Sequence, residues 1–437
     1  MNNQILRLAI PNIISNITVP LLGMVDIAIA GHLSSVLYIG AISLGTTIFN
    51  MIYWNFNFLR MGTGGFTAQA YGAGNNVEMA NLLFRSLLIA LSIGFLIILL
   101  QYPIFQIAGY FIKTENETVV YLRQYFNIVV WSAPATLSMY AFNGWFIGMQ
   151  DSKTPMYVAI VNNVLNIVLS FIFVVALRMQ IKGIALGTTI SQIVAALLFV
   201  VIWKRSYFNE MKSFIQINSI FDGESYKNFF RVNIDIFIRT FLLVTVTTFF
   251  TFASTGMGSN VLAVNALLMQ FFMLFSYFMD GFAYAGEALT GKYIGRKDYT
   301  KLTQTIKYLF AWGASLAVLA ALAYILLTPQ ILSIFTDKTE IISLAKKYII
   351  WIALIPIASF STFVWDGIYV GATASAGMRN SMIVAVAIFF TSYYWSTPVF
   401  HNNGLWLSFI LYLFGRSVMQ TVLYKRALKI GHLYHRT

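Results

Sequence analysis

The sequence has no cysteine, and only 10% of its 437 residues are charged. The lack of cysteine excludes disulfide bonds and thiolate metal sites. Soluble domains carry about 25% charged residues, so the low charge and a hydrophobic content of 59% exclude an ordinary soluble protein. The apolar length is sufficient for many helices of about 20 residues each, which predicts a polytopic membrane protein.

Catalytic and nucleotide-binding signatures are also missing from the sequence. There is no HExxH, no GxSxG and no GxxxxGK[ST], so we expect neither enzyme activity nor a metal centre. Without a phosphate-binding loop, transport would have to use an ion gradient, and the coupling ion is the only cofactor expected. The net charge of +13 does not indicate nucleic-acid binding, because the basic residues lie between apolar segments, as topology signals do.

Long apolar blocks recur along the chain in two sets of six. Helix is the expected structure for such blocks, since a segment in lipid must satisfy its own backbone hydrogen bonds. The predicted fold is therefore all-α, with twelve transmembrane helices. The first six cover 6–31, 38–70, 81–112, 119–149, 154–178 and 183–203, within an N-lobe at 1–204. After a cytoplasmic linker at 205–228, the others cover 229–254, 259–289, 303–335, 341–372, 379–398 and 403–424, within a C-lobe at 229–437.

Basic residues concentrate in alternate connections between these blocks. The positive-inside rule then places both termini and the central linker in the cytoplasm, and the protein in the cytoplasmic (inner) membrane. The N-terminal MNNQILRLAIPN lacks a basic n-region and a cleavage site, so we expect it to begin the first helix rather than to form a signal peptide.

Two distant motif pairs share one register, which indicates an internal repeat. The shift is 223 residues, from position 67 to 290 and from 143 to 366. It relates Thr67–Gly72 (TAQAYG) to Thr290–Gly295 (TGKYIG), Asn143–Gly148 (NGWFIG) to Asp366–Gly371 (DGIYVG), and Asn57 to Asp280. With an even number of helices in each half, the halves are predicted to be parallel repeats, with a substrate cleft between them.

One carboxylate lies deep within the first apolar block. The stretch from Ala9 to Leu33 is almost wholly apolar, yet it contains Asp26. An unpaired charge at such depth costs roughly 3 kcal/mol on insertion scales. The uncharged, protonated form is the cheaper state there, so we expect Asp26 to gain and lose a proton, or to exchange it for a small cation. This residue is predicted to couple transport to an ion gradient.

Four runs of sequence carry a resemblance to a known family. They are the first helix with its proline and late Asp, NGWFIGMQDSKTPM, MDGFAYAGEALTGKYIGRKD and WDGIYVGATASAGMRNSM. The chain resembles the MATE family of multidrug and toxin extrusion transporters, and more narrowly its DinF branch. The resemblance covers essentially the whole chain. It implies twelve helices in two six-helix lobes around a V-shaped cleft, and export of cationic or amphiphilic compounds in exchange for H⁺ or Na⁺.

The resemblance also implies roles for residues of the first lobe. The family's first-helix carboxylate matches Asp26, and the proline linked to bending of that helix matches Pro11. The asparagine near the end of the fourth helix matches Asn143, and the sixth-helix threonine matches Thr188. Pro20 also removes a backbone hydrogen bond from the first helix, so Pro11 and Pro20 are the predicted hinge.

The fifth predicted helix presents one polar stripe. Asn163, Asn166 and Ser170 are spaced at i, i+3 and i+7, and we predict that they meet Asp26. The alternative is that they form ordinary hydrogen bonds between helices. The resembled branch often has a second acid where this chain has Ser170. One carboxyl with amide and hydroxyl neighbours is a poor Na⁺ cage, which favours H⁺, although Na⁺ stays open.

The second lobe has its own intramembrane acids, and the sequence suggests a polar site there. Asp366 and Asp280 replace Asn143 and Asn57 of the first repeat, and Glu287 also lies in an apolar block. Intramembrane acids are functional candidates, but paired with a cation they are often scaffolding. Arg239 is the obvious cation for such a pair. The resembled NorM branch pairs a seventh-helix Glu with the tenth-helix Asp, and that Glu is missing here.

We therefore expect a secondary antiporter that exports small amphiphilic or cationic compounds in contact with membrane lipid, as a monomer. The rival is a lipid-linked oligosaccharide flippase of the same superfamily. Such proteins need several basic residues to hold a pyrophosphate, and only Arg60 and Arg239 look suitable here, which argues against it. A third possibility, a non-transporting enzyme or scaffold, is opposed by the missing catalytic motifs and the intact repeat.

Overall fold

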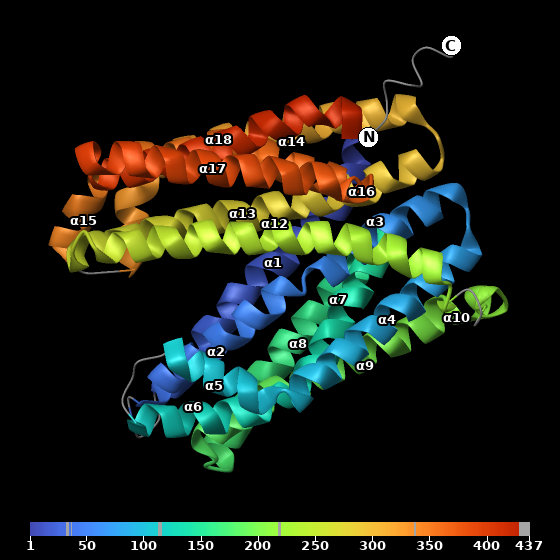
Figure 1. Cartoon of the computed structure of the whole chain (residues 1–437). Coiled ribbons are helices and arrows are strands. Elements are labelled where there is room, and N and C mark those ends of the chain that lie inside the picture. The colour runs from blue at the N-terminus through green and yellow to red at the C-terminus, as the bar shows by residue number, and fades with distance from the viewer. Residues whose placement is uncertain (32–34, 36, 112–115, 217–219, 336–337, 428–437) are drawn as a thin grey trace. The chain divides into compact units, whose positions relative to one another are not determined.

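The structure is a computed structural model that describes residues 1–31, 35, 37–111, 116–216, 220–335 and 338–427 (Figure 1). Every regular element within these ranges is helical. Eleven described helices or helix pairs are long and apolar enough to cross a membrane. The all-α, polytopic prediction is confirmed.

The chain divides into two compact units, at 14–227 and at 1–13 with 228–437. The predicted N-lobe began at residue 1, whereas the first thirteen residues of the structure belong with the second half of the chain. Tyr293 donates a hydrogen bond to Gln4 at 2.8 Å, and Trp312 donates to Asn2 at 3.2 Å. Helix α1 (Asn2–Gly31) therefore runs through both units, with the division between Ile13 and Ile14.

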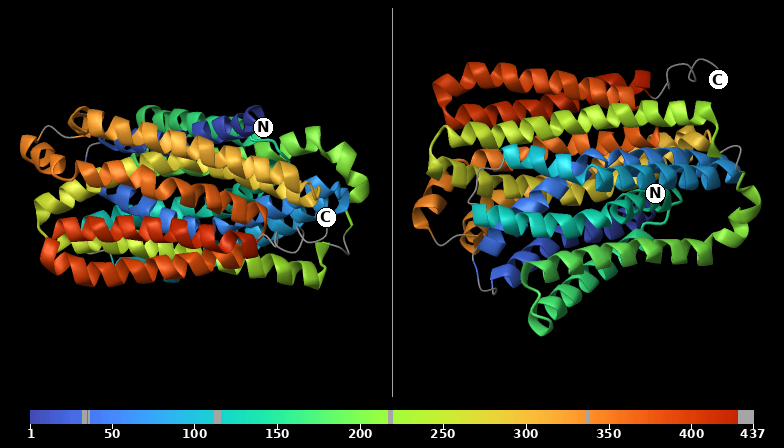
Figure 2. Two further views of the ribbon diagram at one scale, coloured as in Figure 1. Left: turned by 90° about the horizontal axis from the view of Figure 1, so that it is seen from above. Right: turned by 60° about the horizontal axis from the view of Figure 1, so that its bottom comes forward.

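The unit at 14–227 contains the end of α1 and the elements from α2 to η3. These elements are α2 (Leu37–Asn55), α3 (Phe58–Ala73), α4 (Asn76–Leu99), α5 (Gln101–Phe111), α6 (Asn116–Val129), η1 (Val130–Ser132), α7 (Ala133–Gly148), α8 (Lys153–Phe171), η2 (Ile172–Ala176), α9 (Gln180–Ser206), α10 (Phe208–Met211) and η3 (Lys212–Phe214). Helix α3 packs on α7, and α8 packs on α9 (Figures 1 and 2).

The predicted span at 119–149 is interrupted in the structure. Helices α6 and α7 are separated by the short 3₁₀ element η1, and Pro134 stands in the first turn of α7. Proline has no N–H and cannot continue the hydrogen-bond ladder of the preceding helix. The fourth predicted span is therefore built from two shorter helices in succession.

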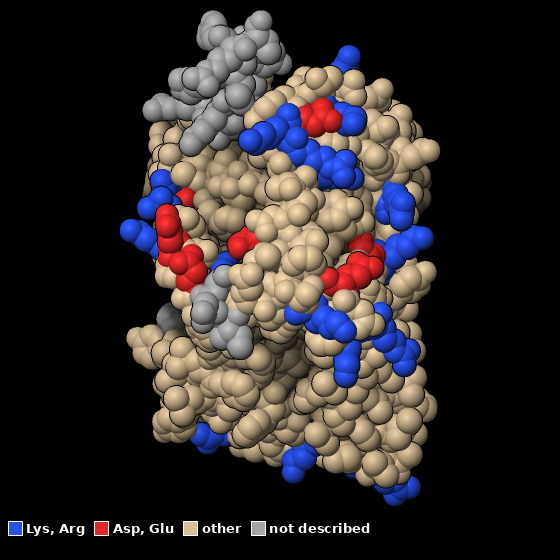
Figure 3. All heavy atoms as spheres, turned by 90° about the vertical axis from the view of Figure 1, so that its right-hand side faces the viewer, with Lys and Arg blue, Asp and Glu red and all other residues tan. Residues whose placement is uncertain are grey.

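Among its described residues, the other unit contains seven helices besides the start of α1. They are α12 (Gly223–Thr255, within this unit from Asn228), α13 (Ser259–Gly295), α14 (Tyr299–Phe335), α15 (Thr339–Lys346), α16 (Ile349–Gly371), α17 (Ser375–Phe400) and α18 (Asn402–Ala427). Helix α16 is central, because it packs on α13, α14 and α18. Figure 3 shows Lys and Arg side chains on one face of the molecule, with Asp and Glu side chains among them.

The repeat seen in the sequence has a counterpart in the packing of each unit. Glycines of α7 lie against the backbone of α3, and a β-carbon on Gly144 would stand 2.2 Å from the carbonyl oxygen of Arg60. In the other unit, a β-carbon on Gly367 of α16 would stand 2.0 Å from the carbonyl oxygen of Ala283 of α13. Glycine allows these close backbone approaches between membrane helices. The glycine pairs carry the same 223-residue register as the motifs.

Candidate functional site

Asp26 lies on α1 and is 8% exposed. Its Oδ1 is buried and has no hydrogen-bond partner among the residues that the structure describes. The salt bridges found between described residues do not include it. A buried carboxylate that lacks a partner pays the full cost of desolvation, so the arrangement favours a group that exchanges its proton.

Polar side chains of α6, α8 and α9 include three residues to be compared with the predicted Asp26 site: Tyr125, Asn166 and Thr188. Tyr125 of α6 is buried, and it interacts with the charge of Asp26 and with the side chain of Thr188 on α9. Asn166 of α8 donates from Nδ2 to the Thr188 hydroxyl at 3.0 Å, and that hydroxyl donates to the carbonyl of Ile184 at 3.0 Å. The hydrogen bonds of the described residues thus join Asn166 to Thr188, and Tyr125 is related to Asp26 electrostatically.

Close packing of α8 on α9 positions Asn166 and Ser170. A β-carbon on Gly187 would stand 2.3 Å from the Ser170 hydroxyl, so only glycine fits there. Oδ1 of Asn166 and Oγ of Ser170 are buried without a hydrogen-bond partner in the described part of the chain. Each unmade hydrogen bond of this kind costs about 1–3 kcal/mol. Together with Oδ1 of Asp26, these two atoms are buried oxygens that are able to accept a hydrogen bond or to face a small cation.

Two further predicted residues are placed differently. Asn163 donates from Nδ2 to the carbonyl of Thr18 at 3.3 Å, about two helical turns before Asp26 on α1. Asn143 is partly buried near the end of α7, and no described contact joins it to Asp26. The proposed participation of these two residues in the site stays a prediction.

Both prolines of the predicted hinge lie inside α1, which is assigned as one helix from Asn2 to Gly31. Pro11 is buried and lies two residues before the division between the two units, whereas Pro20 lies after it. Their role in bending stays a prediction.

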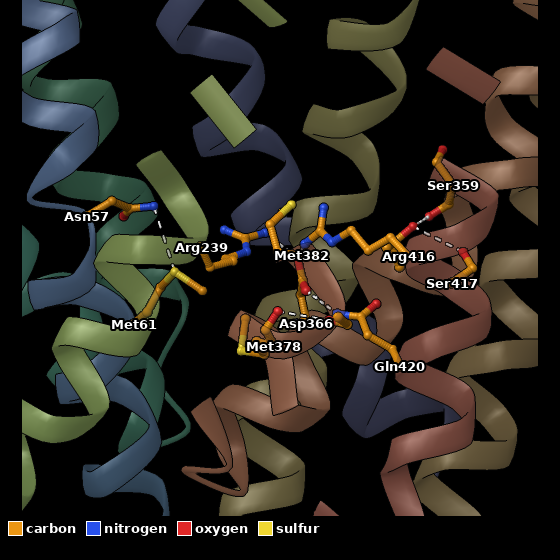
Figure 4. A network of polar contacts seen from close by, with 12 residues as sticks. Asn57, Met61, Arg239, Ser359, Asp366, Met378, Met382, Arg416, Ser417 and Gln420 are labelled. Atoms are coloured by element: carbon orange, nitrogen blue, oxygen red, sulfur yellow. Dashed lines mark hydrogen bonds and ion pairs between the residues drawn. The ribbon is translucent and has the colours of Figure 1, made fainter. Parts of the chain in front are cut away.

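A second buried polar cluster lies in the other unit, around Asp366 of α16 (Figure 4). Oδ2 of this carboxylate accepts hydrogen bonds from Arg239 of α12 and from Arg416 of α18. Oδ1 accepts from Gln420 of α18 at 2.7 Å. The exposed fractions of the side chains are 12% for Arg239, 5% for Arg416 and 8% for Asp366. The sequence correctly suggested the pairing of Arg239 with Asp366.

The remaining acids of the second lobe are dispersed. Asp280 is partly buried on α13 and acts electrostatically on Arg239. Glu287 is buried two turns later on α13, where its carbonyl oxygen lies against Gly371. Asp235 of α12 accepts hydrogen bonds from Arg379 at 2.5 Å and from Ser375 at 2.8 Å. Asp280 thus acts electrostatically on the Asp366 cluster.

Three residues of these clusters were not predicted. Tyr125 carries no charge and gave no signal among 24 tyrosines. Arg416 and Gln420 did leave a signal in the sequence. They stand at i and i+4 in an apolar block, where polar residues are functional candidates. Taking Arg60 and Arg239 as the only suitable basic residues was therefore wrong, because Arg416 is buried as well.

The fold and both clusters define a polytopic membrane transporter with ionisable groups inside its helix bundles. Residues 11–172 and 236–395 match the MatE family, and the chain belongs to that family. It is a transporter and not an enzyme.

Known members resemble the chain over most of its length. DNA damage-inducible protein F of Escherichia coli K12 is 35% identical over 425 residues, which cover 97% of this chain and 92% of that protein. A probable multidrug resistance protein NorM of Thermotoga maritima is 24% identical over 79% of this chain and 75% of its own. The crystal structure of the Vibrio cholerae MATE transporter VcmN in its bent form superposes with a TM-score of 0.87, at 16% identity, over 99% of this chain and 98% of that one.

Proposed function

We propose that the protein is a secondary active antiporter that exports amphiphilic or cationic compounds across the cytoplasmic membrane in exchange for H⁺. The observation that carries the proposal is the Asp26 carboxylate, which is buried in α1 without a hydrogen bond or ion pair to any described residue. Efflux agrees with the name of the NorM relative, and the family is a family of transporters. The relatives do not favour an oligosaccharide flippase.

Exchange requires only that proton and substrate bind two states of the protein with different affinities. Protonation of Asp26 from the outside removes its charge, so the balance of interactions around α1 changes. Pro11 and Pro20 lower the resistance of α1 to bending, because each removes a backbone hydrogen bond. The protonated state then binds a cationic substrate less tightly, which releases it outside. Loss of the proton to the cytoplasm restores the binding state.

The residues that we propose to meet Asp26 favour H⁺ as the coupling ion. Asn166, Ser170 and Thr188 offer amide and hydroxyl oxygens, and within the described residues no group of three or more His, Cys, Asp or Glu side chains is arranged to hold a metal ion. Na⁺ is bound well by several oxygen ligands that include carboxylates, whereas one carboxyl is sufficient for a proton. Both termini are proposed to be cytoplasmic.

The direct test is reconstitution into proteoliposomes loaded with ethidium. A pH gradient or a sodium gradient is imposed separately, at equal size. The proposal predicts ethidium movement with the pH gradient and none with the sodium gradient. Movement driven by sodium alone would overturn proton coupling, and no movement under either gradient would overturn the export of cations.

A further inference from the structure

The cluster around Asp366 has more positive than negative charge in direct contact. Two guanidinium groups, those of Arg239 and Arg416, donate to the same carboxylate oxygen. The third partner, Gln420, is neutral. Asp280 also acts electrostatically on Arg239. An arginine inside a membrane is costly, and a second one on a single acid is more than a structural ion pair requires.

Hydrogen-bond donors are also in excess. The Nε atoms of Arg239 and Arg416 are both buried and, within the described chain, have no acceptor. Both oxygens of Asp366 already accept hydrogen bonds. A guanidinium presents its N–H groups as a planar fork that fits two oxygens of a carboxylate, sulfonate or phosphate. In the described chain, Oε1 of Gln420 is likewise buried without a donor, so the two unmatched Nε donors face one unmatched acceptor, and an anionic group would supply a second.

The walls of the cluster are apolar and adaptable. Met378 and Met382 of α17 border Asp366 and the two arginines in Figure 4. Tyr412 of α18 lies beside them and donates to Sδ of Met382 at 3.3 Å. Methionine side chains repack around ligands of different shape. A ligand suited to this place has an anionic head and an apolar body.

We propose that Arg239 and Arg416 form a binding site for the carboxylate or sulfonate of an amphiphilic anion, which competes with Asp366 for the two guanidinium groups. If the bound anion is also transported, that step rests on the proposed function. Its binding to the two arginines does not. Competition makes a specific prediction. Removing the charge of Asp366 strengthens anion binding, and removing either arginine weakens it.

The test uses the full-length protein in nanodiscs and two fluorescent probes that differ in one group. Dansylglycine carries a carboxylate, and dansylglycinamide carries a neutral amide in its place. The wild-type protein should bind dansylglycine about tenfold more tightly, which is the ratio expected for one charge-assisted interaction. Arg239→Gln and Arg416→Gln should abolish the preference, whereas Asp366→Asn should increase it. Arg123→Gln, a change of an exposed arginine in the other unit, is the charge-matched control and should keep the preference.

Equal binding of the two probes by the wild type would overturn the anion site. A preference that survives in both arginine variants would overturn it as well. Each variant is first checked for a cooperative unfolding transition, and if Asp366→Asn does not fold, the two arginine variants still decide the result. Ethidium transport is measured on the same preparations, so that failure of the anion site is distinguished from failure of ion-coupled export.

Discussion

The carbonyl oxygen of Ala283 lies 2.0 Å from the position that a β-carbon on Gly367 would occupy. Arg60 and Gly144 have the same relationship in the other unit, at 2.2 Å. Since both pairs are related by the 223-residue shift, the repeat preserves a backbone contact between two helices as well as a motif. This contact explains why the motifs contain glycine where an apolar side chain would otherwise suit lipid.

Gly367→Ala should destabilise the unit at 228–437, because the added methyl group overlaps a backbone carbonyl that cannot rotate away. Overpacking of this kind costs about 1–3 kcal/mol. Thermal unfolding of the purified protein in detergent should show a lower midpoint. Gly109→Ala is the control, because a β-carbon there meets nothing within 4 Å. Equal midpoints for the two variants would contradict the packing described for α13 and α16.

Arg379→Met should weaken the contact between α12 and α17. It leaves the buried carboxylate of Asp235 with Ser375 as its described hydrogen-bond partner. Because the Arg379 side chain is 33% exposed, solvent screens the pair, and the expected loss is about 1–2 kcal/mol rather than that of a fully buried pair. Thermal unfolding of the wild type and of Arg379→Met, compared by their midpoints, tests this loss of stability.

The double variant Asp235→Asn, Arg379→Met serves as the comparison for that prediction. It removes both charges, so it should lose less stability than Arg379→Met alone. A double variant that is less stable than the single one would show that the carboxylate does not depend on Arg379.

Much of the fold follows from the sequence, because lipid leaves few alternatives to helix for long apolar blocks. The predicted block at 259–289 lies within α13, and the one at 403–424 lies within α18. The break at Val130–Ser132 could also have been anticipated from Pro134. The sequence did not indicate that the first thirteen residues belong to the other unit, because contacts such as Tyr293 to Gln4 join residues far apart in the chain.

The candidate sites were predictable where a charge or a polar stripe breaks an apolar pattern. Asp26, Asn166 and Ser170 stand out in this way. Tyr125 does not, since a buried hydroxyl on an aromatic ring looks like any other core residue in the sequence. Its position beside Asp26 depends on how α6 packs against neighbouring helices, which periodicity alone does not determine.

Asn166→Leu should lower gradient-driven efflux about tenfold or more while leaving the fold intact. The change keeps the branched shape and the number of heavy atoms of the side chain but removes the amide that binds Thr188 and the buried Oδ1. The net loss of stability should be only about 1 kcal/mol, the value of one hydrogen bond. Counterflow of substrate without an ion gradient should persist, because substrate binding does not use this amide.

Asn209→Leu, a change of an exposed residue of α10, is the matched control for that measurement. If Asn166→Leu and Asn209→Leu drive efflux equally well, the hydrogen bond to Thr188 is an ordinary link between α8 and α9.

The central claim is that Asp26 gives up a proton when a cationic substrate binds. The direct measurement is the pH change on adding ethidium to the purified protein in weakly buffered solution. The wild type and Glu210→Gln, which removes an exposed acid, should both release protons, and Asp26→Asn should bind ethidium without releasing any. Proton release from Asp26→Asn equal to that of the wild type would contradict the account.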